Sequence, residues 1–407
     1  MNSFSSVAVI FGGPSPEHDV SILTGLQAAR GLKSAGMTEQ IKAFYWAKSA
    51  QWYEVDPFVE AEAFLQGLPD KSRKLNFLAV PEGGFFYEGG FAGFAKTVSK
   101  KKSIGVDVVL NCCHGGPGED GTLQAALTLA GVPYTGPSVA GAVLGMDKML
   151  FWTLVHSAGL PALPRISIPP IQRGEKGQAK QDPSQLNEPE DIGFFGDIGP
   201  FIVKPRFGGS SIGIEVVEDL DTARALVAST PHFMQGAVVE PYRNELFDLQ
   251  IGVRTWPKLE FSAIERPFRA SSNSVSFNSG ILGYADKYVS GEGMLTAPRE
   301  LPAKLSQSLE HRLLVLATRV ALLSEVRSVA RIDFLSDGNE LYINEINTIP
   351  GSLTRHLWVD PPISFEDILS DMLSESISIP MGMNMYTTQG ADGTALRKAG
   401  SIASKLA

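Results

Sequence analysis

The sequence predicts a protein of mixed α/β and α+β class, and three stretches carry that prediction. Residues 6–12 form an apolar strand that leads into a Gly-rich turn and a helix, and residues 105–112 begin the same succession. Strand, Gly-rich turn and helix in this order are typical of a parallel α/β sheet. Towards the C-terminus, an amphipathic helix at 303–323 precedes strands at 328–335 and 340–347, as in an α+β domain.

Length and composition limit the class of protein further. The 407 residues suffice for several domains, because one domain usually takes about 100–200 residues. Hydrophobic residues make up 43% and charged residues 19%, as in soluble globular proteins. The net charge of −9 argues against a nucleic-acid partner. No apolar run reaches the ~18 residues of a membrane span, so no membrane partner is expected.

The two cysteines, Cys112 and Cys113, are adjacent, which excludes a disulfide framework. No signal peptide is evident, so we expect a cytoplasmic protein. A catalytic thiol beside His114 is one interpretation of the cysteines, and a buried strand end is the one we favour.

The turn after the first strand is expected to begin a helix with Ser15 as N-cap and Pro16 at the first helical position. Glu17 then lies in the first turn, where a carboxylate could hold a substrate ammonium or simply complement the helix dipole. His114 follows the second strand, the usual place of an active-site residue in an open α/β sheet. Taken alone, however, His114 is better interpreted as a structural histidine.

The C-terminal hairpin contains the strongest candidate site. Arg331 and Asp333 share one face of their strand, and Glu345 and Asn347 share one face of the next. A three-residue loop centred on Asn339 would pair Asp333 with Glu345 and Arg331 with Asn347, whereas a slip of one residue would separate the two sets. Carboxylate and amide oxygens suit Mg2+ that carries substrate phosphates. An exposed polar sheet face is the alternative.

A strand that ends in Lys204 leads into a Gly/Ser loop at 208–213. Backbone N–H groups and an ammonium in this arrangement could surround phosphate oxygens, although the loop is not a P-loop because the lysine precedes the glycines. An ordinary hairpin is the alternative. Lys148 and Lys287 supply further point charges suited to phosphates, unless they are solvated surface lysines.

Together these segments resemble the D-alanine–D-alanine ligase family of the ATP-grasp superfamily. The resemblance extends from residue 7 to about residue 358. The segments that carry it, in chain order, are Gly12-Gly13-Pro14-Ser15-Pro16-Glu17-His18-Asp19-Val20-Ser21, His114-Gly115-Gly116-Pro117-Gly118-Glu119-Asp120-Gly121, Pro133-Tyr134-Thr135-Gly136, Met146-Asp147-Lys148, Lys204-Pro205, Gly209-Ser210-Ser211-Ile212-Gly213, Lys287-Tyr288, Arg331-Ile332-Asp333 and Asn344-Glu345-Ile346-Asn347-Thr348-Ile349-Pro350-Gly351.

The resemblance implies an ATP-grasp fold in which a parallel α/β N-terminal domain precedes two α+β subdomains that clamp ATP. On this basis we expect an N-terminal substrate-binding domain at 1–145, a central subdomain at 146–238 and a C-terminal catalytic subdomain at 239–407. The polar stretch 171–190 reads as an exposed insertion, and 269–280 as a long surface loop. The family often forms homodimers through its first domain, so the resemblance leaves a homodimer open here, without independent support from the residues.

The resemblance also implies roles for individual residues. Those implied to bind ATP are Lys148, Lys204, Gly209, Ser211, Glu240 (adenine), Glu245 (ribose) and Lys287. Those implied to hold two Mg2+ ions, with Mn2+ as an alternative, are Asp333, Glu345 and Asn347. Those implied to bind the amino acids or stabilise the transition state are Glu17, His114, Ser210, Tyr288, Arg331 and the N–H of Gly351.

The implied reaction joins two D-alanines, or related small amino acids, through an acyl phosphate to give a dipeptide, ADP and phosphate. Arg355 and His356 depart from the family pattern beside the second-substrate pocket, and 240–245 is about two residues short. We therefore also consider an amide ligase of a specialised pathway whose second substrate pairs an extra carboxylate with Arg355. A phosphotransferase and a protein without turnover are the remaining alternatives.

Overall fold

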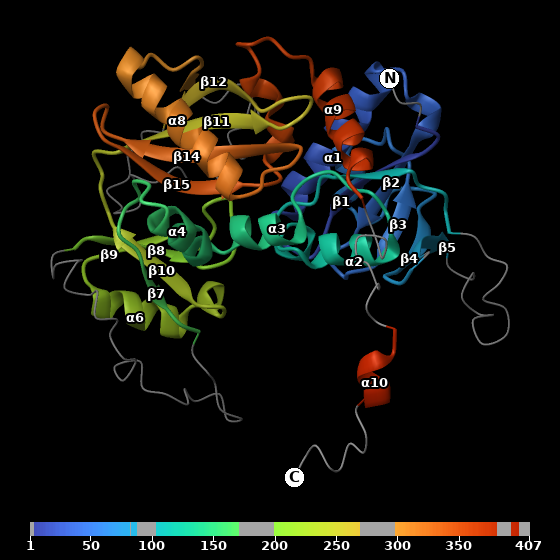
Figure 1. The fold of residues 1–407 in the computed structure, drawn as a ribbon, viewed down its shortest axis with the longest axis horizontal. Coiled ribbons are helices and arrows are strands. Elements are labelled where there is room, and N and C mark those ends of the chain that lie inside the picture. Colours follow the sequence, from blue (N-terminus) through green and yellow to red (C-terminus); the bar gives the residue numbers. More distant parts are fainter. Residues whose placement is uncertain are drawn as a thin grey trace.

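The computed structural model describes residues 4–81, 83–87, 103–170, 199–268, 298–380 and 392–398. These residues form three β-sheets with helices packed against them (Figure 1). The strand orders are β5-β4-β3-β2-β1-β6 in the first sheet, β7-β10-β8-β9 in the second and β13-β12-β11-β14-β15 in the third.

The first sheet combines parallel and antiparallel strands. Its strands are β1 (Val7–Gly12), β2 (Ile41–Trp46), β3 (Trp52–Val55), β4 (Arg73–Leu78), β5 (Gly84–Tyr87) and β6 (Val108–Asn111). β1 is parallel to β2 and to β6, whereas β3, β4 and β5 extend one side as antiparallel strands. The predicted parallel sheet is thus confirmed for three strands, and its antiparallel extension was not predicted.

Alternation along β1 fixes which helices cover each face of the first sheet. Val9 and Phe11 belong to a core shared with α1 (His18–Ser34) and α9 (Phe365–Ser378). Ile10 belongs to the core on the opposite face, with α2 (Thr122–Ala130). In Figure 1 α9, close to the end of the chain, accordingly lies beside α1.

The second and third sheets are antiparallel. The second contains β7 (Ile166–Ile168), β8 (Phe201–Pro205), β9 (Glu215–Val217) and β10 (Ala237–Pro241), and α6 (Leu220–Ser229) packs on it. The third contains β11 (Phe247–Arg254), β12 (Glu260–Pro267), β13 (Arg299–Glu300), β14 (Val329–Ser336) and β15 (Leu341–Asn347). One face of the third sheet packs on α8 (Gln307–Leu323) and α4 (Lys148–Ser157), which leaves the other face available for a site (Figure 1). Further helices are α3 (Val139–Met146), α10 (Thr394–Lys398) and several short 3-10 segments, including η7 (Gly351–Leu357).

Two helix starts differ from the prediction. Helix α1 begins at His18 with Glu17 at the N-cap position, so Ser15 is not the cap. The Ser15 hydroxyl instead donates to the carbonyl of His114 at 2.6 Å and accepts the N–H of Glu17. Helix α8 begins at Gln307 rather than 303, because the Ser306 hydroxyl accepts the N–H of Leu309 and caps it.

The 171–190 insertion and the 269–280 loop lie outside the described residues. None of the helices in the described part of the chain is long and apolar enough to cross a membrane. Cys112 and Cys113 are buried and outside any disulfide, and burial raises the pKa of both thiols. A thiolate nucleophile is therefore disfavoured at this strand end.

Candidate active site

A first cavity lies between the second and third sheets. Seven of the residues implied to bind ATP or metal line it: Lys148, Lys204, Gly209, Ser211, Glu240, Asp333 and Glu345. They come from α4, β8, the Gly/Ser loop, β10, β14 and β15. The cavity thus gathers cationic, backbone and carboxylate groups from separate parts of the chain, as binding a nucleotide with its metal requires.

Lys204 and Glu240 form the buried polar base of this cavity. Lys204 Nζ donates to Glu240 Oε2 at 3.0 Å and to Asn344 Oδ1 at 3.3 Å. Arg165 Nη2 lies 2.7 Å from Glu240 Oε1, and its guanidinium also donates to the carbonyls of Lys148 and Asn344. Burial alone would raise the pKa of Glu240, but Arg165 and Lys204 hold it below its usual range. The cluster consequently keeps an ionised Glu240 between two cations.

Lys148 is positioned by the start of its helix. Asp147 caps α4 by accepting the N–H groups of Met149 and Leu150, and its carboxylate binds Arg206 through two hydrogen bonds of 2.9 and 2.7 Å. The Lys148 ammonium donates to the carbonyl of Gly208. Burial lowers the pKa of Lys148, and the charge of Glu345 opposes that shift. The lysine is thus tied to the Gly/Ser loop that borders the cavity.

The hairpin has the register required for a metal site. Asp333 pairs with Glu345, and Arg331 pairs with Asn347. Nearer the turn the register shifts by one, because a β-bulge lies between Asp333 and Phe334 and leaves Asn344 as the extra residue. Asn344 and Glu345, although consecutive, therefore both line the first cavity, as is usual for a bulge beside a site.

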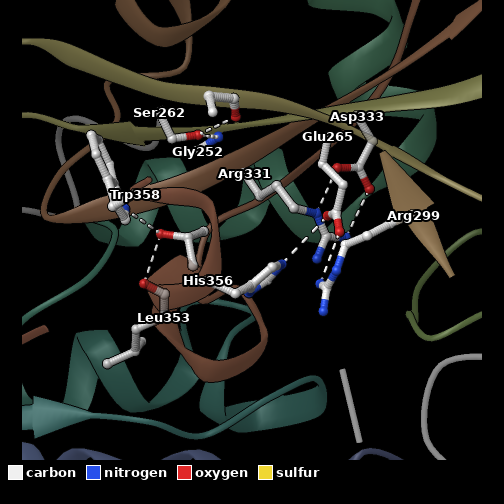
Figure 2. Close-up of polar contacts among 11 residues, drawn as sticks. Gly252, Ser262, Glu265, Arg299, Arg331, Asp333, Leu353, His356 and Trp358 are labelled. Carbon is white, nitrogen blue, oxygen red and sulfur yellow. Dashed lines mark hydrogen bonds and ion pairs between the residues drawn. The ribbon is translucent and has the colours of Figure 1, made fainter. Parts of the chain in front are cut away.

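The Arg331 guanidinium binds both oxygens of Asp333, at 2.7 and 2.8 Å (Figure 2). The side-chain amide of Asn347 donates to the same carboxylate at 3.1 Å. No group of three or more His, Cys, Asp or Glu residues gathers as a metal cage within the described residues. Two carboxylates and an amide still fit a hard cation that takes its other ligands from phosphate oxygens and water.

A second cavity adjoins the first and brings the implied amino-acid residues together. Glu17, His114, Ser210, Arg331, Asn347 and Gly351 line it. Lys148, Gly209, Ser210 and Glu345 line both cavities. A carboxylate in the second cavity could therefore meet a phosphate in the first beside Lys148 and Glu345.

Glu17 reaches the second cavity because β1 and β6 are parallel neighbours, so the turns at their carboxyl ends lie together. Its Oε1 accepts the Ser210 hydroxyl at 2.5 Å. A Cβ at Gly115 would lie 2.5 Å from Glu17 Oε2, and one at Gly209 2.9 Å from either carboxylate oxygen. Both glycines thus permit the close approach of two turns to this carboxylate.

His114 and Glu119 connect the first sheet to the segment that follows β15. His114 is buried, its Nε2 lies 2.8 Å from the Thr24 hydroxyl oxygen, and burial lowers its pKa, which favours a neutral imidazole. Glu119 accepts the N–H groups of Gly115 and Ile349, each at 2.9 Å. Burial and the charge of Glu17 raise the pKa of Glu119 to about 7. Glu119 thereby joins two turns that border the second cavity.

Several implied residues lie elsewhere. The Glu245 side chain is 47% exposed, pairs with Arg243 and is absent from the lining of the first cavity, whereas Arg243 belongs to that lining. Lys287 and Tyr288 lie outside the described residues. The Arg355 guanidinium lies 5.6 Å from the ring centre of Phe365. The imidazole of His356 is buried, with Nε2 3.4 Å from Glu265 Oε2 (Figure 2).

Sequence reasoning missed some of the residues in and around these cavities. Asp248 and Gln250 are two residues apart on β11, so their side chains share one face of the strand and both line the first cavity. This face can be assigned to the site only when the order of the strands in the sheet is known. Glu119 lies within a motif already noted as Gly-rich. Arg165 and Glu265 gave no signal, because their positions depend on a long-range ion pair and on strand order. Asn344 lies within a motif already noted, but its place in the first cavity depends on the bulge.

The arrangement of the three sheets is that of the ATP-grasp fold. A D-alanyl-alanine synthetase A from Vibrio cholerae superposes with a TM-score of 0.70 at 19% identity, covering 92% of this chain and 99% of that one. The VanG D-Ala:D-Ser ligase of Enterococcus faecalis gives 0.68 at 23% identity, with 92% and 100% covered. These likenesses establish the fold.

Sequence comparison establishes the family. The model of the D-ala D-ala ligase N-terminus matches residues 6–137, and that of the D-ala D-ala ligase C-terminus matches residues 154–374. A D-alanine–D-alanine ligase of Wolinella succinogenes is 27% identical over 374 residues, or 91% of this chain and 94% of its own. One from a Synechococcus species is 29% identical over 379 residues, or 90% and 97%. The chain belongs to the D-Ala–D-Ala ligase family of ATP-dependent ligases, which use divalent metal ions.

Proposed function

We propose that this protein joins two D-alanine molecules, or closely related small amino acids, through an acyl-phosphate intermediate. The observation that carries the proposal is the junction of the two cavities, where Lys148 and Glu345 border both. A nucleotide in the first cavity and an amino acid in the second would meet there. The dipeptide would serve peptidoglycan biosynthesis in the cytoplasm, the usual role of this family.

The first cavity would hold ATP with two Mg2+ ions, or Mn2+ in their place. Asp333, Glu345 and Asn347 would bind the metal, which neutralises phosphate charge during the transfer. Lys148 and Lys204 would bind phosphate oxygens, Gly209 and Ser211 would supply loop contacts, and Glu240 would face the adenine. Glu245 as a ribose ligand remains a prediction, as does Lys287, which the family resemblance assigns to a mobile loop that closes over the site as a lid.

In the second cavity Glu17, held by Ser210, would bind the ammonium of the first amino acid. His114 would border that amino acid as a neutral side chain, and Tyr288 would complete the contact to Glu17 when the lid closes. Arg331 and the N–H of Gly351 would stabilise the oxyanion that forms when the second amine attacks the acyl phosphate. Closure would exclude water from this intermediate.

The second amino acid is proposed to be small and neutral, such as D-alanine. Arg355 lies against Phe365 and His356 faces the carboxylate of Glu265, so neither offers an obvious partner to an extra substrate carboxylate. A ligase of a specialised pathway with an acidic second substrate is therefore the less supported alternative.

Purified protein incubated with ATP, Mg2+ and a panel of D- and L-amino acids tests the proposal. We expect phosphate release that depends on D-alanine, with a dipeptide as the product in mass spectra. A phosphorylated amino acid as the stable product would identify a phosphotransferase instead. Unchanged substrates across the panel would identify a protein without turnover.

A further inference from the structure

Four polar residues lie side by side across the third sheet, and one of them is unused by the proposed function. Glu265 on β12 pairs with Gln250 on β11, which pairs with Asp333 on β14, which pairs with Glu345 on β15. Residues directly opposite one another project from the same face. Glu265 therefore lies on the face that carries the implied metal ligands, two strands from Asp333.

Glu265 is a buried carboxylate with partners from two other segments. Arg299 Nη1 donates to its Oε1 at 3.0 Å, and His356 Nε2 lies 3.4 Å from its Oε2 (Figure 2). Burial alone would raise the pKa of Glu265, but His356 and Arg299 hold it below its usual range. Glu265 is accordingly ionised at neutral pH and attracts the imidazole that faces it.

His356 belongs to η7, which begins at Gly351 on the wall of the second cavity. The backbone turns sharply between them, with positive φ at Ser352, Leu353 and Thr354. L-residues adopt such angles only where surrounding contacts impose them. At the start of the turn, the Ser352 N–H donates a hydrogen bond of 3.2 Å to the Thr24 hydroxyl.

The Thr354 hydroxyl accepts from Trp358 Nε1 at 3.1 Å and donates to the Leu353 carbonyl at 2.7 Å, which fixes the middle of the turn. The contact between His356 and Glu265 joins its far end to β12. In the proposed reaction the second amine would approach a carbonyl carbon held beside Gly351 and Arg331, which both line the second cavity. The remaining atoms of that amino acid would then lie near the chain that follows Gly351.

We propose that Glu265 is a specificity-determining positioning residue, which acts through His356 to hold η7 against the third sheet and so limits the size of the second amino acid. The inference rests on the proposed ligation of two amino acids. Removing the charge of Glu265 would release His356, allow the strained turn to relax and widen the space beside Gly351.

The test is a competition between second substrates of graded size, with D-alanine as first substrate and mixed dipeptides quantified by mass spectrometry. D-Alanine and D-2-aminobutyrate differ by one methylene group, which a well-formed pocket discriminates by roughly 10–200-fold. The product ratio reports relative kcat/KM and does not depend on how much of the enzyme is folded. The variants are Glu265→Gln, His356→Gln and the double variant. Glu260→Gln, which alters an ion pair with Arg254 at the other end of β12, is the control.

We expect Glu265→Gln to reduce the preference for D-alanine about fivefold or more, His356→Gln to do the same, and the double variant to match a single one, because both act through one contact. Glu260→Gln should keep the wild-type ratio. An unchanged ratio in Glu265→Gln, even with lower total yield, would overturn the inference, as would additive effects in the double variant. Absence of any dipeptide from the wild-type enzyme would instead refute the proposed function, and this inference with it.

Discussion

Asp333 on β14 lies directly opposite Glu345 on β15, although the turn between their strands would not by itself bring them together. Ser336 pairs with Leu341 next to the turn, and a regular ladder continued from that pair would place Asp333 opposite Asn344. The bulge at Asn344 shifts the register by one residue and restores the carboxylate pair. The implied metal site therefore depends on a local irregularity of the sheet.

Replacing Asp333 with Asn should lower kcat/KM by about 100- to 1,000-fold, the usual effect of removing one preorganised charge contact. The change removes one of two opposed carboxylates and leaves Arg331 without its charged partner. The Mg2+ concentration needed for half-maximal activity should rise in parallel. The matched control is Asp337→Asn in the exposed hairpin turn, where the carboxylate accepts the N–H groups of Asn339 and Glu340. Equal losses in both variants would contradict a metal-binding role for Asp333.

Replacing Ser210 with Ala should raise the KM for the first amino acid about tenfold. A hydrogen bond to a charged group contributes roughly 1.5–3 kcal/mol, and Glu17 would lose the hydroxyl that fixes it. The KM for ATP should change less than that for the amino acid. Ser229→Ala, which removes an exposed hydroxyl from α6, is the control and should leave both constants unchanged. A larger rise in the KM for ATP would assign Ser210 to the nucleotide instead.

Replacing Glu240 with Gln should lower the free energy of unfolding by about 3–5 kcal/mol, since loss of one partner leaves buried charges uncompensated. Arg165 and Lys204 would remain beside each other in the base of the first cavity. Urea denaturation checks this prediction. Asp221→Asn, which breaks an ion pair whose carboxylate is 90% exposed, should cost less than about 1 kcal/mol. A comparable loss in the two variants would mean that the buried cluster does not contribute as its geometry indicates.

Because of Glu119, the free energy of unfolding should decrease as the pH rises towards neutrality. Its pKa is raised from 4.5 to about 7 in the folded protein, so the unfolded chain loses this proton first as the pH rises. The protonated Glu119 carboxyl therefore contributes about 3 kcal/mol to the free energy of unfolding below pH 4.5, and this contribution is lost between pH 4.5 and about 7. Glu119→Gln should flatten the dependence of unfolding free energy on pH in that window. An unchanged slope in Glu119→Gln would contradict the raised pKa of Glu119.

Much of the fold and site could be predicted from local pattern. The pairing of Asp333 with Glu345 follows from side-chain alternation and an estimate of turn length, although the actual turn spans 337–340 and the bulge compensates for the difference. The strand that ends near Lys204 and the Gly/Ser loop after it were likewise predicted from the sequence. These features depend on residues close to one another in the chain.

What could not be predicted depends on long-range contacts or unfavourable backbone angles. Ser15 appeared to be a helix cap, but its hydroxyl donates to the carbonyl of His114, in the turn that follows the neighbouring strand β6. The direction of Arg355 and His356 follows from three consecutive positive φ angles, which a Ser-Leu-Thr stretch does not signal. Glu265 can be assigned to the face of the sheet that carries the site only when the order of the strands is known.

Transfer of oxygen from the first amino acid to phosphate tests the central claim most directly. D-Alanine labelled with 18O in its carboxylate is supplied with ATP, and the released phosphate is examined by mass spectrometry. Attack of a carboxylate oxygen on the γ-phosphorus, followed by attack of the second amine on the carbonyl carbon, leaves one labelled oxygen in phosphate and one in the new amide. We predict one 18O per phosphate formed. Dipeptide formation with unlabelled phosphate would contradict the acyl-phosphate mechanism.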